Sequence, residues 1–236
     1  MKYFVCSDIH GYYDELIKAL DKAKFDRDNL DHQLIVVGDC FDRGNKSLEV
    51  YTYLKELTDS GRGIVIKGNH EMFLYEIVEL NEKRVKFNIE RNGFLFTLNS
   101  FCGEDVTGWD LVDIKSQFIK QNPNIIDWLD SLPFYLETEN YIFAHAGLNT
   151  EVEDWKVCDW KRAVWTKTRE FRKLDLIKHG ISKTVVHGHV STRNLRDDDG
   201  IDSNDFSVYE SIDKQKIGID GSVMKTKRIN ILIIED

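Results

Sequence analysis

Short apolar stretches of this 236-residue chain repeatedly end in clusters of charged, amide or imidazole side chains. The stretch around Val36 runs into Gly38-Asp39-Cys40-Phe41-Asp42-Arg43-Gly44, which places two carboxylates and a guanidinium within five residues. Charged groups at the end of a buried strand cost free energy unless they bind something. In open α/β sheets, ligands bind at the carboxyl ends of the strands. The pattern therefore predicts an α/β protein with a ligand site at its strand ends.

The first eighty residues are organised as three strand–helix units. We expect strands at residues 3–6, 34–38 and 63–67. Apolar residues at helical spacing predict helices at 12–23, 47–57 and about 72–78, with Ser47 as the cap of the second. Repeated units of this kind are typical of a parallel sheet with right-handed crossovers.

The rest of the chain is expected to complete the same domain. Residues 81–127 are less periodic and predict a partly helical elaboration that covers one side of the sheet. Later strands are predicted at 141–144, 184–186, 218–223 and 229–234, and an acidic solvated loop at 197–202. The five tryptophans are expected to pack in the core or at its edges. We expect residues 1–236 to form a single domain.

Composition excludes several classes of protein. The formal net charge of −9 argues against general nucleic-acid binding, because a phosphate backbone requires a positive footprint. Apolar stretches are too short to span a bilayer, so no membrane partner is expected. Four well-separated cysteines favour free thiols in a reducing, cytoplasmic setting over a disulfide framework.

The predicted strand ends supply enough donors for two metal ions. Asp8 and His10 lie two apart on an extended segment, so both side chains can reach one cation. Mixed oxygen and imidazole donors suit manganese, iron or zinc. The strand ends together supply Asp8, His10, Asp39, Asn69, His145 and His189. If Asp39 bridges, this set can hold two adjacent divalent ions, which together clamp a phosphoryl group for in-line displacement.

Three further residues fit the chemistry of such a site. His70 directly follows Asn69 and can lie at the site without binding metal. Asp42 could orient His70 so that the pair protonates a leaving oxygen. Arg43 could hold phosphoryl oxygens with its planar fork of donors.

These blocks, in this order, resemble the signature of the calcineurin-like metallophosphoesterases. The resemblance rests on Asp8-Ile9-His10-Gly11, Gly38–Gly44, Gly68-Asn69-His70-Glu71, His145-Ala146-Gly147 and Gly188-His189. It is narrower to the phosphoprotein phosphatases, especially their bacterial and bacteriophage serine/threonine branch. The resemblance implies a four-layer α/β (α+β) fold, in which a central β-sandwich of two mixed sheets is flanked by α-helices.

The resemblance also implies a role for each residue of the site. Asp8 and His10 would hold the first metal, Asp39 would bridge, and Asn69, His145 and His189 would hold the second. His70 would be the general acid, paired with Asp42, while Arg43 and Asn69 would contact the phosphate. The cofactors would be two divalent ions, manganese first, with iron or zinc as alternatives.

One phosphate-binding position departs from the family pattern. A second arginine is expected shortly after a tryptophan, and the chain reads Trp165-Thr166-Lys167-Thr168-Arg169. Family spacing selects Lys167, whereas the bidentate chemistry favours Arg169. Both remain candidates, with Arg169 preferred.

The expected activity is metal-dependent hydrolysis of phosphoserine or phosphothreonine in proteins, by direct attack of water held between the metals. An alternative is a symmetrical bis(5′-nucleosyl)-tetraphosphatase, whose relatives share the same blocks. Five acidic residues near the presumed mouth disfavour that alternative, because they would repel a polyphosphate: Asp197, Asp198, Asp199, Asp202 and Asp205. A catalytically silent binding scaffold and a nuclease are further alternatives. Substrate and oligomeric state remain open.

Overall fold

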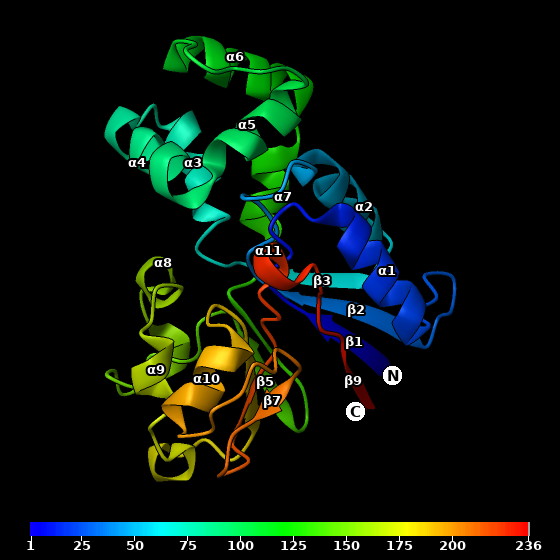
Figure 1. Cartoon of the computed structure of the whole chain (residues 1–236), viewed down its shortest axis with the longest axis vertical. Coiled ribbons are helices and arrows are strands. Elements are labelled where there is room, and N and C mark those ends of the chain that lie inside the picture. Colours follow the sequence, from blue (N-terminus) through cyan, green and yellow to red (C-terminus); the bar gives the residue numbers. More distant parts are fainter. Residues whose placement is uncertain (236) are drawn as a thin grey trace.

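The computed structural model describes residues 1–235, and its first sheet contains the three strands expected early in the chain (Figure 1). The strand order is β3-β2-β1-β9. The strands are β1 (Lys2–Cys6), β2 (His32–Val37), β3 (Gly63–Ile66) and β9 (Leu232–Glu235). The first three are parallel and β9 pairs antiparallel with β1, so the sheet is mixed.

Two amphipathic helices follow the first two strands, as the spacing predicts. They are α1 (Tyr13–Ala23) and α2 (Ser47–Asp59). Leu16 and Leu20 of α1 are buried at helical spacing. The prediction that Ser47 caps α2 is wrong. Lys46 occupies the cap position, and the Ser47 hydroxyl lies 3.0 Å from Thr97 Oγ1 instead.

The second sheet is built from the later part of the chain. Its order is β4-β5-β6-β8-β7, with β4 and β7 antiparallel to their neighbours. The strands are β4 (Tyr135–Glu137), β5 (Tyr141–Ala144), β6 (Thr184–His187), β7 (Tyr209–Glu210) and β8 (Lys216–Gly218). The predicted strand at 218–223 is wrong, because the chain turns where Asp220 Oδ1 accepts the Ser222 N–H and then enters α11 (Val223–Thr226).

Alternating side chains pack the two sheets face to face. In β2, Leu34 and Val36 face a core shared with the helices, whereas Ile35 and Val37 face the other sheet. Their partners between the sheets include Phe143 of β5. A period of two thus gives each strand one face for helices and one for the sandwich. The expected four-layer fold of two mixed sheets flanked by helices is confirmed.

Two groups of helices extend from the sandwich on either side of the strand ends (Figure 1). One group gathers at the top of the view: α3 (Met72–Val78), α4 (Glu82–Asn92), α5 (Phe94–Cys102), α6 (Leu111–Gln121) and α7 (Ile125–Ser131). The other comprises the short helices η1 (Trp155–Val157), α8 (Trp160–Ala163), α9 (Thr168–Phe171), η2 (Leu176–His179) and α10 (Thr192–Asp198). The predicted acidic loop is partly helical, since α10 includes Asp197 and Asp198.

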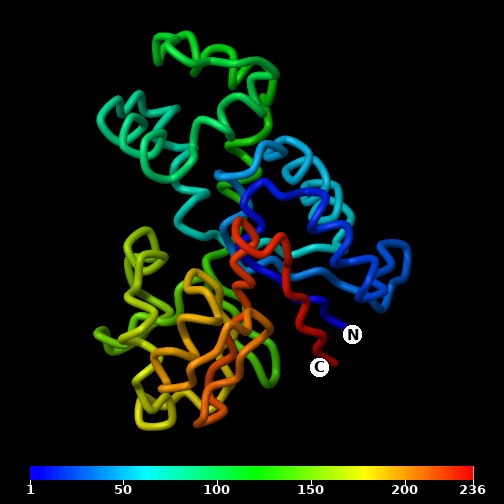
Figure 2. The backbone as a smooth tube through the Cα atoms, in the orientation of Figure 1, coloured from blue at the N-terminus to red at the C-terminus, as the bar shows by residue number. Residues whose placement is uncertain are grey.

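The two ends of the described chain lie side by side (Figure 2), because Lys2 of β1 pairs with Glu235 of β9. Within residues 1–235, each helix is too short or too polar to cross a membrane.

Candidate metal centre and active site

The polar strand ends converge in space, and their backbone is strained where they do so. Positive φ angles occur at Asp8 (51°), His10 (50°), Asp39 (57°) and His189 (65°). Non-glycine residues rarely adopt this region, and such strain clusters at functional sites where the surrounding structure enforces it. All four side chains belong to residues predicted to bind metal.

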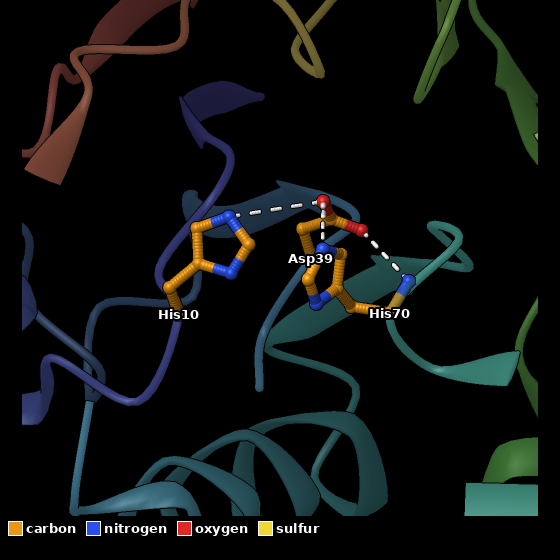
Figure 3. Close-up of side chains that lie close together, drawn as sticks. All are labelled: His10, Asp39 and His70. Carbon is orange, nitrogen blue, oxygen red and sulfur yellow. Dashed lines mark hydrogen bonds and ion pairs between the residues drawn. The ribbon is translucent and has the colours of Figure 1, made fainter. Parts of the chain in front are cut away.

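One group of donors surrounds Asp39 from the side of the first sheet. His10, Asp39 and His70 point toward one another (Figure 3). Asp39 Oδ2 lies 3.8 Å from Nε2 of His10 and 3.8 Å from Nε2 of His70. The three side chains are buried, so the site combines dense charge with little water.

A second group surrounds the other oxygen of Asp39 and reaches the second sheet. His145 Nε2 lies 3.2 Å from Asp39 Oδ1, 3.0 Å from Asn69 Oδ1 and 3.2 Å from His189 Nδ1. Asp39 is therefore common to both groups. Its Oδ2 faces His10 and His70 and its Oδ1 faces His145, while its role as a bridging ligand stays a prediction.

Two histidines turn Nε2 toward the cluster, because a backbone carbonyl accepts the proton of Nδ1. His10 Nδ1 donates to the Phe41 carbonyl at 2.8 Å, and His145 Nδ1 donates to the Val37 carbonyl at 2.9 Å. A carbonyl can only accept, so Nε2 carries the lone pair whenever the ring is neutral. This arrangement is typical of metal-binding histidines.

Asp8 approaches the cluster from the end of β1. Its Oδ2 accepts the backbone N–H of His189 at 3.1 Å, and its Oδ1 lies 3.9 Å from His10 Nε2. Burial and the nearby Asp220 carboxylate raise the pKa of Asp8 well above its ordinary value. Two buried carboxylates beside the anionic Asp39 form a region that a bound cation would stabilise.

Burial and neighbouring charged groups shift the pKa values of the histidines in the cluster. Burial and then His145 lower the pKa of His189 to about 4, so this ring is neutral and can bind metal. Burial alone would lower the pKa of His145, but the Asp39 carboxylate raises it to about 10. The donors are carboxylate oxygens, one amide oxygen and imidazole nitrogens clustered around a shared carboxylate. This set fits two divalent cations.

His70 forms the predicted pair with Asp42. His70 Nδ1 lies 2.6 Å from Asp42 Oδ2, and Asp42 Oδ1 accepts the Thr97 hydroxyl at 2.7 Å. Burial alone would lower the pKa of His70, but Asp39 and Asp42 raise it above its ordinary value. The raised pKa favours the protonated form of this imidazole, which can donate a proton to a group at the cluster.

Arg43 lies across two of the site histidines. Its Nη1 is 2.8 Å from His10 Nε2, and its Nη2 is 3.4 Å from His70 Nε2. Its backbone has φ 68° and its N–H donates to the Gly93 carbonyl at the start of α5. A guanidinium held at this point can bind an anion placed over the cluster.

The second cationic position remains a proposal. Arg169 Nε is held by Asp198 at 2.8 Å, and Lys167 Nζ lies 3.2 Å from Glu170. Both residues nevertheless line a cavity of about 360 Å³ together with His189.

Glu71 is a site residue whose role the sequence reasoning missed. Its buried carboxylate accepts three backbone N–H groups, from Asp39 (2.9 Å), Cys40 (2.7 Å) and Gly68 (2.6 Å). A Cβ on Gly68 would collide with Asp39 Oδ1, so this close approach requires glycine. The sequence feature that could have indicated this role is the position of Glu71 directly after Asn69 and His70.

Thr97 and Asp220 were missed for a different reason. Thr97 binds Asp42 through its hydroxyl and lies 55 residues away on α5, and Asp220 approaches Asp8 from the turn after β8. Neither residue belongs to a polar cluster that directly follows a predicted strand, so the local sequence did not indicate that either one lies at the site.

Comparisons with known proteins identify the family. Residues 1–213 match the sequence model of the family described as calcineurin-like phosphoesterase. Proteins of this family use a binuclear metal centre. Among curated relatives, the symmetrical bis(5′-nucleosyl)-tetraphosphatase of Pasteurella multocida is 27% identical over 213 residues, covering 88% of this chain and 64% of the relative. PrpE, the asymmetrical bis(5′-nucleosyl)-tetraphosphatase of Bacillus velezensis, is 28% identical, covering 64% of this chain and 58% of the relative. The matched region is thus less than two thirds of either relative.

Two solved structures share the fold. A protein serine/threonine phosphatase from Saccharomyces cerevisiae aligns with a TM-score of 0.58 and 14% identity over 100% of this chain and 80% of its own. A cold-active protein tyrosine phosphatase aligns with a TM-score of 0.59 and 19% identity over 99% and 73%. At this identity the likeness concerns the fold alone.

The expected serine/threonine protein phosphatase activity is wrong. The curated relatives are named bis(5′-nucleosyl)-tetraphosphatases, which supports the alternative.

The charge argument against that alternative also fails. Four of the five acidic residues are paired with arginines: Asp197 with Arg193, Asp198 with Arg169, Asp199 with Arg172 and Asp205 with Arg196. Their repulsion of a polyphosphate is thereby offset. The chain is a hydrolase of the calcineurin-like phosphoesterase family.

Proposed function

We propose that this protein hydrolyses bis(5′-nucleosyl) tetraphosphates symmetrically, cleaving the central phosphoanhydride to give two nucleoside diphosphates. The single observation that carries the chemistry is the pair of donor groups that share Asp39, one with His10 and His70 and the other with His145 and His189, with Arg43 beside the first. The names of the relatives support the substrate class. Relatives of both cleavage types match this chain, and symmetrical cleavage is proposed because a symmetrical enzyme matches 88% of it.

The metal ligands are proposed as two sets that share one residue. Asp8, His10 and Asp39 would hold one divalent ion, and Asp39, Asn69, His145 and His189 the other. Bound there, the ions would neutralise charge on the phosphoryl oxygens and lower the pKa of water. Manganese is proposed first, and the mixed donor set also suits iron and zinc.

Arg43 and His70, which lie side by side, are proposed to act on different oxygens of the reacting phosphoryl group. Arg43 Nη1 occupies the His10 lone pair and becomes available to phosphoryl oxygens when His10 serves as a ligand. His70 would protonate the leaving diphosphate oxygen from Nε2, while Asp42 holds its Nδ1 and keeps the ring oriented. Asn69 would also contact the phosphate, and Arg169 or Lys167 would supply the outer positive charge.

The test is hydrolysis of diadenosine tetraphosphate by the manganese-loaded protein, with nucleotides separated by ion-exchange chromatography. We expect ADP as the sole nucleotide product and slower phosphate release from a phosphothreonine peptide. An ATP and AMP mixture would contradict symmetrical cleavage, and the absence of nucleotide products would contradict the function.

Asp39→Asn removes the anionic ligand that both metal sites are proposed to share. It should abolish binding of both metals, as measured by metal analysis, and hydrolysis in the same assay.

A further inference from the structure

A cavity lies beside the metal centre and is not used by the proposed chemistry. Its volume is about 670 Å³, within the range of about 300–1,000 Å³ usual for small-molecule sites. It is lined by the loop after β5, at residues 148–151, and by residues of α8, α9 and η2. It shares Trp165, Thr166, Lys167 and Glu170 with the smaller cavity that reaches His189. The two cavities therefore form adjoining spaces that lead from the metal ligands.

Trp165 stands where these two cavities meet. Its indole centroid lies 6.0 Å from the Phe73 ring, and Phe73 in turn lies 4.8 Å from the His70 ring. Two aromatic contacts thus position the indole relative to the general acid. Trp165 remains 43% exposed, whereas Trp128 is only 4% exposed and donates its ring N–H to Thr58. Trp165 therefore packs at the edge of the core and leaves part of its indole exposed to the cavities.

The remaining lining offers polar groups that suit a heterocycle and its sugar. Asn149, Thr150 and Thr166 offer both donors and acceptors. Glu151 lines the same cavity, together with Arg162 and the ion pair of Lys167 with Glu170. Lys167 and Glu170 also line the smaller cavity, so this pair lies where the phosphates would leave the larger one.

We propose that Trp165 stacks a nucleobase and that the 670 Å³ cavity is the nucleoside subsite of this enzyme. The proposal rests on the proposed function, because it assigns one end of the dinucleotide. Every nucleobase presents a π-face, so stacking on an exposed indole holds any base without reading its identity. The phosphates would then run from the cavity past His189 toward Asp39, which places the scissile bond over the metal cluster.

Direct binding tests this subsite without relying on hydrolysis. ADP and pyrophosphate, both as manganese complexes, are titrated calorimetrically into the manganese-loaded protein. We expect ADP to bind more tightly than pyrophosphate. Trp165→Ala should weaken ADP binding by at least about fivefold more than it weakens pyrophosphate binding, because only ADP carries a base. Trp165→Phe keeps a ring and should recover most of this difference.

Trp109→Ala is the matched control, since Trp109 is similarly exposed (38%) but lies in the loop before α6. It should leave both affinities unchanged. Equal affinities for ADP and pyrophosphate in the unmodified protein would overturn the subsite, and so would equal losses in Trp165→Ala.

The two proposals fail separately. If diadenosine tetraphosphate is not cleaved but ADP binding depends on Trp165, the subsite stands and the function falls. If the dinucleotide is cleaved and Trp165→Ala does not discriminate between the ligands, the function stands and the subsite falls. Thermal denaturation of each variant verifies that it is folded.

Discussion

At His70, the two nitrogens of one imidazole ring face different partners. Nδ1 meets Asp42 at 2.6 Å, while Nε2 lies 3.8 Å from Asp39 within the donor cluster. Asp42 is itself held by the hydroxyl of Thr97 on α5. The ring is therefore oriented by a chain of hydrogen bonds that begins outside the metal centre. This orientation presents Nε2 to the cluster, where it can donate a proton; because metal-binding histidines are held in the same way, metal content is the measurement that separates the two roles.

Replacing His70 by asparagine separates these two roles. His70→Asn should lower kcat on diadenosine tetraphosphate by about 10²- to 10⁴-fold, the usual contribution of a general acid or base. Metal content should stay near that of the unmodified protein, as measured by mass spectrometry of bound metal. Loss of metal in this variant would make His70 a ligand instead. His32→Asn, which alters a histidine of β2 that accepts the Asp26 N–H, should retain full activity.

At the scale of the elements, Glu71 ties together the segments that follow β2 and β3. Its Oε2 accepts the N–H groups of Asp39 and Gly68, and its Oε1 accepts that of Cys40. The backbone of Asp39 and of Gly68, which precedes Asn69, is thus held by one buried carboxylate that lies between two strand ends. Residues that orient ligands in this way commonly affect metal affinity as strongly as weaker ligands do.

Glu71→Gln tests these hydrogen bonds while leaving the volume of the side chain nearly unchanged. A neutral amide has one acceptor oxygen, so at least one buried N–H loses its partner, which costs about 1–3 kcal/mol. We expect a lower midpoint of urea unfolding, and manganese affinity about 10- to 100-fold weaker by calorimetry.

Glu56→Gln is the control for this substitution, because Glu56 is exposed on α2 and pairs only with Arg27 at the surface. It should change both quantities little. If Glu71→Gln behaved like Glu56→Gln, Glu71 would not be a positioning residue.

At the scale of the whole molecule, the candidate metal centre joins the two sheets. Asp8, Asp39 and Asn69 follow strands of the first sheet, and His145 and His189 follow strands of the second. Ligands that bind the folded state stabilise it by mass action, by about 2.7 kcal/mol at one hundred times the dissociation constant. Metal binding should therefore stabilise the whole sandwich rather than one loop.

Manganese should raise the unfolding temperature of the metal-free protein by several degrees, as measured by calorimetry.

The stabilisation by manganese should grow as the pH rises. Asp39 raises the pKa of His145 to about 10 in the metal-free fold, so His145 must release a proton to bind metal between pH 6 and 9. Apparent affinity should then increase about tenfold per pH unit. A pH-independent shift would contradict this assignment of His145, and Asp39→Asn should abolish the shift altogether.

The sequence by itself determined the strand–helix units, the mixed α/β class and most side chains that gather at the strand ends. These features are local: alternation and helical spacing set the elements, and a polar cluster directly after an apolar strand marks its own position. His145 follows such a strand, and the family resemblance selects His189 within the cluster after the strand at 184–186, although each lies more than 100 residues from Asp39.

Only the tertiary structure decided which distant groups complete the site. It showed that Thr97 supports Asp42, that Asp220 approaches Asp8 and that Trp165 borders both cavities. It also showed that arginines neutralise the acidic residues on which the sequence argument against a polyphosphate depended. The physical reason is that burial, pairing and cavity shape depend on contacts between segments far apart in the chain, which local patterning does not encode.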